Sequence, residues 1–219
     1  MTSRLFLPPL NPLTALPKGL AGRLAAPLME RSGERAAGPV LEALALPSGA
    51  RLLEIGFGTG ALLARARRRG VLVAGVDPSA QMVARARGRG LGEIRQGTAR
   101  HLPWSRQSFD AAAIVHAFEL FAEPERELAE IARVLVPGGR LALCLAPLTA
   151  RARARCPNPL IAADEPMEAI ANALGHAGFC PEISDFALAG GRLILASRRV
   201  ETRAATHGRA RAKEAHIAA

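Results

Sequence analysis

The sequence predicts an α/β fold in which a doubly wound, mostly parallel seven-stranded sheet ends in an antiparallel hairpin and follows an N-terminal helical extension. Three observations support this prediction. An apolar run at 51–56 passes directly into alternating glycines and a helix start. Apolar runs and helical patterns then alternate along the chain, as expected for strands joined by helical crossovers. Two strand-like segments near the end are joined only by Ala189-Gly190, which suits a hairpin and excludes a helical crossover.

The strands are expected at the apolar runs, which are 51–56, 71–76, 93–96, 109–115 and 140–146, with the hairpin strands at 179–188 and 191–198. An unbroken apolar run such as the second one is typical of a strand that is covered on both faces. Helices are expected where apolar residues recur at helical spacing, which occurs at 60–69, after Ser79, and in segments that begin at Pro124 and Asp164. Val136-Pro137-Gly138-Gly139 is expected to stop the helix that begins at Pro124.

Two further helices are predicted before the first strand. One covers 20–29, where leucines recur at every fourth position, and the other opens at Pro39. The polar segment 31–38 is expected to be a loop between them. Together, residues 19–46 are interpreted as a lid over the edge of the sheet where a ligand binds.

The remaining segments are expected to be irregular. Residues 1–18 are proline-rich and predict an irregular arm, and residues 199–219 are basic and predict a disordered tail. Residues 147–163 are expected to form a loop beside the ligand, and this loop carries three arginines, Arg151, Arg153 and Arg155. Such charge runs are more often solvated than functional. One folded domain is therefore predicted over 19–198.

Composition argues against some classes of partner. The 219 residues carry a net charge of +10, but all except two of the 29 basic residues are arginine, which we interpret as base composition of the coding DNA. The chain has no Tyr and one Trp, so aromatic platforms for single-stranded nucleic acid are scarce. Nucleic acid is not the expected partner, although the charge keeps it as an alternative.

The expected location is the cytoplasm. No apolar run approaches the roughly 18 residues that a membrane span requires. Prolines interrupt the apolar start, which does not favour a cleaved signal peptide. The cysteines are Cys144, Cys156 and Cys180, without a CxxC pair, so neither a disulfide framework nor a metal site is expected. The oligomeric state does not follow from the sequence.

The glycine turn after the first strand predicts a ligand site. Glycines permit a tight turn and close approach of a ligand to the backbone, and the following helix start offers free N–H groups. Gly56-x-Gly58-x-x-Ala61 formally matches a dinucleotide fingerprint, with Asp77 near the position of a ribose-binding acid. Glu54, two residues before the first glycine, favours a different ligand, because a second acid beside a pyrophosphate is unfavourable.

Four motifs in order give the chain a specific resemblance over about 19–198. They are Leu53-Glu54-Ile55-Gly56-Phe57-Gly58-Thr59-Gly60, Gly75-Val76-Asp77-Pro78-Ser79, Leu102-Pro103-Trp104 with Ser108-Phe109-Asp110, and Arg133-Val134-Leu135-Val136-Pro137-Gly138-Gly139. In these motifs the chain resembles the class I S-adenosylmethionine-dependent methyltransferases, which are Rossmann-like. It is most similar to the small-molecule type that includes the ubiquinone and menaquinone C-methyltransferases.

The resemblance implies a site for S-adenosylmethionine, which is cationic and carries no phosphate. The implied cofactor residues are Glu54, Gly56, Phe57, Gly58, Gly60, Asp77, Pro78, Met82, Thr98, Ala99 and Val115. The glycines would line the methionine moiety, Asp77 would accept from the ribose hydroxyls, and Pro78 and Met82 would flank the adenine. Met82 fits an ordinary core position equally well. Thr98 stands where the family usually has an acid, which implies a weaker hold on the adenine amino group.

Catalysis by this family implies alignment of the acceptor in a dry site, with a base only where the nucleophile is protonated. His116, just past the fourth strand, is the candidate base, or else a loop histidine with a structural hydrogen bond. His101 is a weaker candidate, and Glu119 is either an acceptor contact or a solvated residue. No Asn/Asp-Pro-Pro motif or Pro-Cys nucleophile stands after the fourth strand, so the usual DNA-base chemistries are not expected.

The predicted function is methyl transfer from S-adenosylmethionine to a small, apolar, aromatic or lipid-like acceptor, without a metal. Two alternatives stay open. The first is a non-catalytic module that binds S-adenosylmethionine, which Thr98 and the lack of a clear base would suit. The second is a methyltransferase that acts on RNA, which the net charge of +10 would suit.

Overall fold

The computed structural model describes residues 19–188 and 191–200, with side chains for all of them except 19–29, 32, 183–188 and 191. The predicted arm at 1–18, the hairpin link at 189–190 and most of the predicted tail, 201–219, lie outside the described residues. The domain bounds proposed from the sequence therefore stay a prediction.

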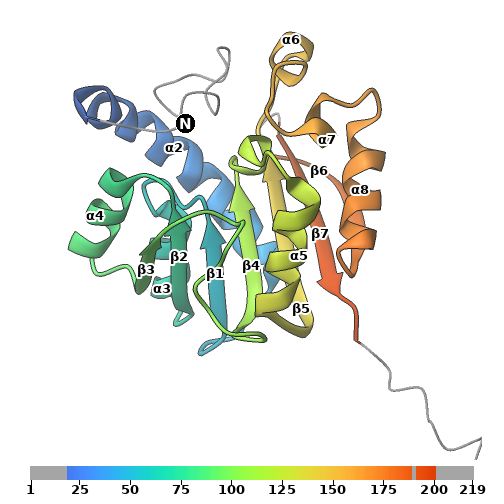
Figure 1. Cartoon of the computed structure of the whole chain (residues 1–219). Coiled ribbons are helices and arrows are strands. Elements are labelled where there is room, and N and C mark those ends of the chain that lie inside the picture. The colour runs from blue at the N-terminus through green and yellow to red at the C-terminus, as the bar shows by residue number, and fades with distance from the viewer. Residues whose placement is uncertain (1–18, 189–190, 201–219) are drawn as a thin grey trace, which may run out of the picture.

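One seven-stranded sheet runs through the protein in the order β3-β2-β1-β4-β5-β7-β6 (Figure 1). Its strands are β1 Arg51–Ile55, β2 Leu72–Asp77, β3 Glu93–Gln96, β4 Phe109–Val115, β5 Leu135–Leu145, β6 Phe179–Leu188 and β7 Gly191–Arg198. The first five are parallel, and β7 pairs antiparallel with both β5 and β6. The predicted fold class is confirmed, including the hairpin at the end of the sheet.

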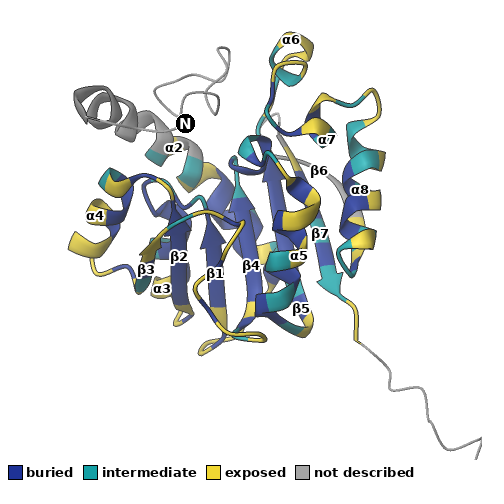
Figure 2. Cartoon of the chain, in the orientation of Figure 1, coloured by how far each residue is buried: buried dark blue, intermediate teal, exposed yellow. Residues whose placement is uncertain are grey.

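Helices cover both faces of the sheet. The described helices are α2 Gly19–Leu44, α3 Ala61–Arg68, α4 Ala80–Gly88, the 3₁₀ turn η1 Phe118–Leu120, α5 Pro124–Val134, α6 Ala150–Arg153, α7 Pro159–Ala162 and α8 Pro166–His176. One apolar cluster joins α2, α3 and α4 to the sheet, and a second joins α5, α7 and α8 to the opposite face. The central strands lie buried between these layers (Figure 2).

Alternate residues of the central strands supply the two clusters. In β1, Leu52 packs with α2 and α3, whereas Leu53 belongs to the cluster of α5 and α8. The same alternation separates Ala111 from Ala112 in β4. This is the period of two that a strand imposes, applied to a sheet covered on both sides. The carboxyl ends of β1, β2, β4 and β5 consequently meet at one edge, where the ligand site is expected.

The prediction of two helices before the first strand is wrong, because α2 is one continuous helix. The polar sequence of 31–38 predicts a loop, yet the glycines of this segment allow close packing. A Cβ on Gly33 would lie 3.2 Å from Ala61 Cβ, and one on Gly38 would lie 3.3 Å from Arg65 Nη2. Glu30 also binds Arg85 at 2.8 Å. Tertiary packing against α3 and α4 therefore overrides the polar, glycine-containing sequence.

Two further boundaries differ from the prediction. The segment 147–163 is not wholly a loop, because Thr149 and Asn158 cap the short helices α6 and α7 through side chains that accept from Ala152 N and Leu160 N. The strand expected to begin at residue 140 begins at Leu135. Its start pairs with Phe109, and a register shift then absorbs the Pro-Gly-Gly segment. A bulge of this kind lets a strand keep pairing across residues that resemble a stop signal.

Candidate cofactor and acceptor site

The glycine turn joins β1 to α3 at the carboxyl edge of the sheet. Gly56, Gly58 and Gly60 all have positive φ, at 70°, 52° and 75°, a conformation that other residues adopt at a cost. Space is equally limited at this turn. A Cβ on Gly56 would lie 2.5 Å from Ala117 Cβ, and one on Gly60 would lie 2.6 Å from Leu91 Cδ1. The turn therefore requires glycine for backbone conformation and for close packing, and it touches the segment that follows β4.

Glu54 places a buried carboxyl group beneath this turn. Its side chain is 3% exposed, and Oε2 has no hydrogen-bond partner among the described residues. Burial raises the pKa of Glu54 well above its usual range, a backbone hydrogen bond from Leu63 opposes that rise, and nearby Asp77 adds to it. A buried carboxylate oxygen without a donor is unfavourable in the protein alone. A bound cation or N–H donor would satisfy it.

Asp77 ends β2 and holds the turn from the other side. Its Oδ2 accepts from Gly58 N and its Oδ1 accepts from Ser79 N, both at 2.8 Å. Burial raises the pKa of Asp77, and these two backbone hydrogen bonds lower it. Each oxygen keeps a lone pair for a further donor. Asp77 therefore fixes the loop geometry and can also accept from a ligand hydroxyl.

The other predicted cofactor residues differ in how far they reach the site edge. Pro78 and Thr98 are exposed there, Ala99 is buried and Val115 is half-buried. Met82 is 1% exposed and belongs to the apolar cluster of α2, α3 and α4. This position agrees with the interpretation of Met82 as an ordinary core residue. Phe57 also packs inward, since a Cβ on Gly75 would lie 2.7 Å from Phe57 Cδ1. Only the backbone of Phe57 is therefore available to a ligand.

His116, the candidate base, follows β4 with a φ of 53°. Its Nε2 lies 3.6 Å from Cys144 Sγ, and its backbone N–H donates to Cys144 O at 2.8 Å. Burial lowers the pKa of His116, which keeps the ring neutral near pH 7. The imidazole is thus directed at β5, toward a cysteine on the face covered by α2.

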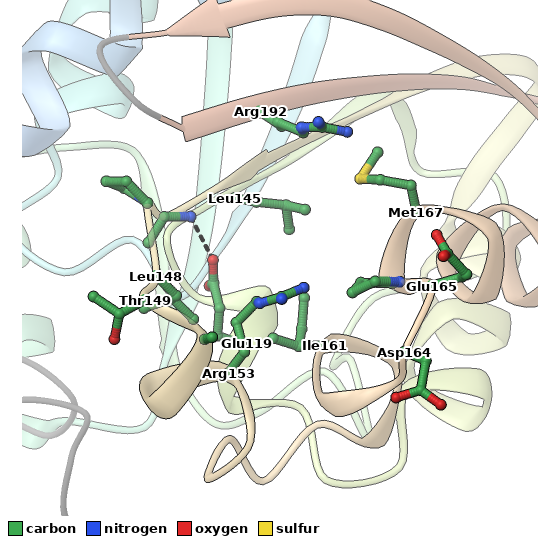
Figure 3. A pocket seen from close by; sticks show the side chains of 14 residues that line it. Glu119, Leu145, Leu148, Thr149, Arg153, Ile161, Asp164, Glu165, Met167 and Arg192 are labelled. Atoms are coloured by element: carbon green, nitrogen blue, oxygen red, sulfur yellow. Dashed lines mark hydrogen bonds between the residues drawn. The ribbon is translucent and has the colours of Figure 1, made fainter.

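A cavity of about 660 Å³ opens on the other side of the β4 and β5 ends (Figure 3). The 147–163 segment, α8 and β7 surround it, and the lining includes Glu119, Leu145, Leu148, Arg153, Ile161, Met167 and Arg192. The expectation that this segment lines a binding space is therefore supported. The sequence predicts Glu119 to be either an acceptor contact or a solvated residue, and the solvated interpretation is wrong because the residue is 2% exposed. Its position inside the apolar run 117–121 was the signal for burial.

The short segment that follows β4 connects the glycine turn to the cavity. Ala117 packs against the Cβ position of Gly56, and Glu119, two residues later, lines the cavity. The turn and the cavity therefore both contact this segment, and a two-substrate transfer requires the donor and the acceptor at neighbouring sites.

The donor set at the turn fits S-adenosylmethionine. That molecule presents an ammonium, a sulfonium, a carboxylate and a ribose diol. The unpaired oxygen of Glu54 suits a cation, the Gly58–Gly60 backbone suits the methionine moiety, and Asp77 suits the diol. A pyrophosphate would instead meet two buried carboxyl groups, which like-charge repulsion disfavours. Fold and site together define a Rossmann-like domain of the S-adenosylmethionine-dependent class.

Comparison with known proteins specifies the family. A family model described as a methyltransferase domain matches residues 53–143. The chain is 36% identical over 142 residues to a phosphatidylethanolamine N-methyltransferase of Cereibacter sphaeroides, covering 61% of this chain and 66% of that protein. It is 42% identical over 99 residues to a demethylmenaquinone methyltransferase of Thermus thermophilus, covering 42% of this chain and 44% of that protein.

A solved structure supports the fold. It is the complex between the Haloferax volcanii Trm112 methyltransferase activator and the putative methyltransferase, with a TM-score of 0.65, 21% identity, and coverage of 82% of this chain and 95% of that chain. The chain belongs to the class I S-adenosylmethionine-dependent methyltransferases, and S-adenosylmethionine is the cofactor of the family. The chain spans less than two thirds of the length of the two curated relatives described above.

Two negative findings apply to the described residues. No helix within 19–188 or 191–200 has the length and apolar character needed to cross a membrane. In the same part of the chain, no cluster of three or more His, Cys, Asp and Glu side chains has a geometry that could hold a metal ion.

Proposed function

We propose that this protein transfers the methyl group of S-adenosylmethionine to a small, apolar, aromatic or lipid-like acceptor bound in the cavity beside Glu119. The observation that carries the proposal is the segment after β4, in which Ala117 touches the glycine turn while Glu119 lines the cavity. The largely apolar lining of Leu145, Leu148 and Ile161 suits an acceptor with an apolar body.

S-adenosylmethionine would supply an electrophilic methyl group on a cationic sulfur. The protein's residues would supply position and exclusion of water. The Gly56 turn and Asp77 would fix the donor, and the cavity walls would align the acceptor with it. Holding two reactants in line can provide roughly 7–11 kcal/mol of the barrier without covalent participation by the enzyme.

Turnover with a panel of acceptors tests the proposal. The protein is incubated with S-adenosylmethionine and, separately, a menaquinol precursor, simple phenols, an amine-bearing phospholipid and bulk RNA, and release of S-adenosylhomocysteine is measured. We expect release with one of the small acceptors and none with RNA. Release with RNA alone would replace this proposal with the RNA alternative. S-adenosylmethionine binding without release on any acceptor would favour the non-catalytic module.

Replacement of His116 tests whether the reaction uses that residue as a base. If the ring takes a proton from the acceptor, His116→Ala lowers kcat by about 10²–10⁴ and leaves the affinity for S-adenosylmethionine unchanged. Burial lowers the pKa of His116, so a reaction that uses this ring as its base should slow only as the pH drops below that lowered pKa. His101→Ala, at an exposed histidine, is the control. An unchanged kcat in His116→Ala would show that His116 is not the base and that its ring has only a structural role beside Cys144.

We also propose a cytoplasmic location. Its support is the state of the cysteines, because Cys144, Cys156 and Cys180 are all free thiols and the first two are buried. Burial raises the pKa of both buried thiols to about 11, so neither is a reactive thiolate. Labelling of the protein in intact cells by a thiol reagent before and after reduction would test this, and a disulfide that needs reduction would contradict it.

A further inference from the structure

Glu119 is a second buried carboxyl group whose hydrogen bonding is incomplete. Oε1 accepts from Ala146 N at 2.5 Å, which fixes the carboxyl group against the end of β5 (Figure 3). Oε2 is buried and has no hydrogen-bond partner among the described residues. The desolvation penalty of a buried oxygen without a donor is larger than the net stabilisation from one hydrogen bond. Glu119 lines the cavity of about 660 Å³, so a ligand in that cavity can supply the missing donor.

The cavity around Glu119 has an apolar interior and charged residues toward its rim. Leu145 and Ile161 are buried and Met167 is half-buried. Arg153 is half-buried and Arg192 is exposed, and neither guanidinium has an ion-pair partner within the described part of the chain. The carboxylates of Asp164 and Glu165 are exposed at the same opening.

We propose that Oε2 of Glu119 binds the methyl-accepting atom of the substrate, that this atom is the nitrogen of a primary or secondary amine, and that an anionic group of the same molecule lies toward Arg153 and Arg192. The acceptor would then be an amphiphile with an aminoalkyl headgroup and a neighbouring phosphate or carboxylate. This inference rests on the proposed function, since it concerns the acceptor of that same transfer.

Charge decides between an amine and the other acceptor types. An alkylammonium supplies Oε2 with an N–H donor and a positive charge, and a charge-assisted hydrogen bond of this kind is stronger than a neutral one. A phenol or quinol supplies an O–H donor without a positive charge. After the ammonium has lost one proton, the nitrogen becomes positive again as it takes up the methyl group, and the carboxylate of Glu119 stabilises that developing charge.

The step balances with the groups present. The bound ammonium first passes one proton to Oε2 of Glu119 and from there to water, which frees the nitrogen lone pair and restores the carboxylate. The lone pair then forms the new N–C bond as the C–S bond of the donor breaks, and the electron pair of that bond stays on sulfur. The methylated product leaves as an ammonium, so one proton is released for each methyl group transferred. No oxidant, reductant or metal is needed.

The first test measures binding in the absence of S-adenosylmethionine. Dihexanoyl phosphatidylethanolamine, below its micelle concentration, is titrated into the protein by calorimetry, with the phosphatidylcholine and phosphatidylglycerol of the same chain length as comparisons. We expect the amine lipid to bind at least 10-fold more tightly than both, because the choline lacks an N–H and the glycerol lacks a positive charge. Glu119→Gln should remove that preference, since a charged hydrogen bond is lost. Equal affinity for the three lipids, or an unchanged preference in the variant, would overturn the inference.

Glu127→Gln is the matched control. Glu127 is also buried, at 4% exposure, and Oε2 of its side chain accepts from Glu123 N at 3.2 Å. Burial raises the pKa of Glu127 as it does that of Glu119. Glu127 lies on α5 and is not among the residues that line the cavity. A loss of lipid preference in this variant as well would show a general effect of neutralising buried acids and would overturn the assignment.

The second test measures turnover and separates the two proposals. We expect wild type to methylate the amine lipid, Glu119→Gln to lower kcat by about 10²–10⁴, and its affinity for S-adenosylmethionine to stay unchanged. Wild-type turnover of a quinol or phenol but not of the amine lipid would overturn this inference and leave the proposed function standing. Failure of the wild-type protein to bind S-adenosylmethionine would instead overturn the proposed function.

Discussion

Glu54→Gln is expected to weaken S-adenosylmethionine binding and at the same time stabilise the free protein. A charged hydrogen bond from the donor's ammonium to Glu54, as proposed, would contribute about 1.5–3 kcal/mol, so its loss should raise Kd roughly 10–100-fold. In the free protein the same carboxyl is buried with Oε2 unpaired. Removing the charge should therefore raise the free energy of unfolding by about 1–3 kcal/mol at pH 8.

The gain in stability should depend on pH in a defined direction. Burial raises the pKa of Glu54 in the folded state, so the folded protein holds this proton more tightly than the unfolded chain does. The penalty is absent below the unfolded pKa of about 4.3 and grows as the pH rises through the folded pKa. Urea unfolding of wild type and Glu54→Gln at pH 4 and pH 8 measures this difference.

Glu42→Gln is the control for Glu54→Gln, because Glu42 is an exposed acid on α2 with 69% of its side chain accessible. It should change neither Kd nor stability by more than about 0.5 kcal/mol. A Glu54→Gln variant that binds S-adenosylmethionine as tightly as wild type would show that the carboxylate does not face the donor. If Glu54→Gln is less stable than wild type at pH 8, the conclusion that Oε2 of Glu54 is unpaired in the free protein is wrong.

Gly56→Ala should have the larger effect on the fold. The new Cβ would lie 2.5 Å from Ala117 Cβ, and the backbone φ is 70°. Overpacking costs about 1–3 kcal/mol and the left-handed conformation about 1–2 kcal/mol. We expect the free energy of unfolding to fall by about 2–5 kcal/mol and S-adenosylmethionine binding to be lost, as measured by urea unfolding and calorimetry.

Two companion variants separate the causes of that loss. Gly49 also has a positive φ, at 83°, but a Cβ there would meet nothing within 4 Å, so Gly49→Ala measures the backbone cost alone. Ala117→Gly in the Gly56→Ala background removes the clashing methyl group and should recover the overpacking part. Two results would refute the contact between the turn and the end of β4. One is a Gly56→Ala variant that loses no more unfolding free energy than Gly49→Ala does. The other is a double variant that regains none of the unfolding free energy lost in Gly56→Ala.

The features that local sequence patterns could predict are those set by neighbouring residues. The β3 and β4 bounds match the prediction at both ends, because Pro, Gly and polar residues punctuate those apolar runs. The hairpin follows from the short link at Ala189-Gly190. The glycine turn with Glu54 and Asp77 follows from residue types and spacing, because the chemistry of the cofactor restricts both.

The features that sequence patterns missed depend on distant contacts. Gly33 and Gly38 resemble loop residues until α3 packs against them, and then they permit a continuous α2. Pro137-Gly138 resembles a strand boundary, yet β4 pairs across it through a register shift. Glu119 could not be assigned to a cavity because the walls come from the 147–163 segment, α8 and β7, which the fold brings to one edge.

The most direct test of the central claim is calorimetric titration of the purified chain with S-adenosylmethionine and, separately, with NADH. The unpaired carboxylate of Glu54 and the turn at Gly56 predict binding of S-adenosylmethionine with one site per chain and no heat from NADH. Binding of NADH without binding of S-adenosylmethionine would contradict the account, because the turn would then accommodate a pyrophosphate beside two buried acids.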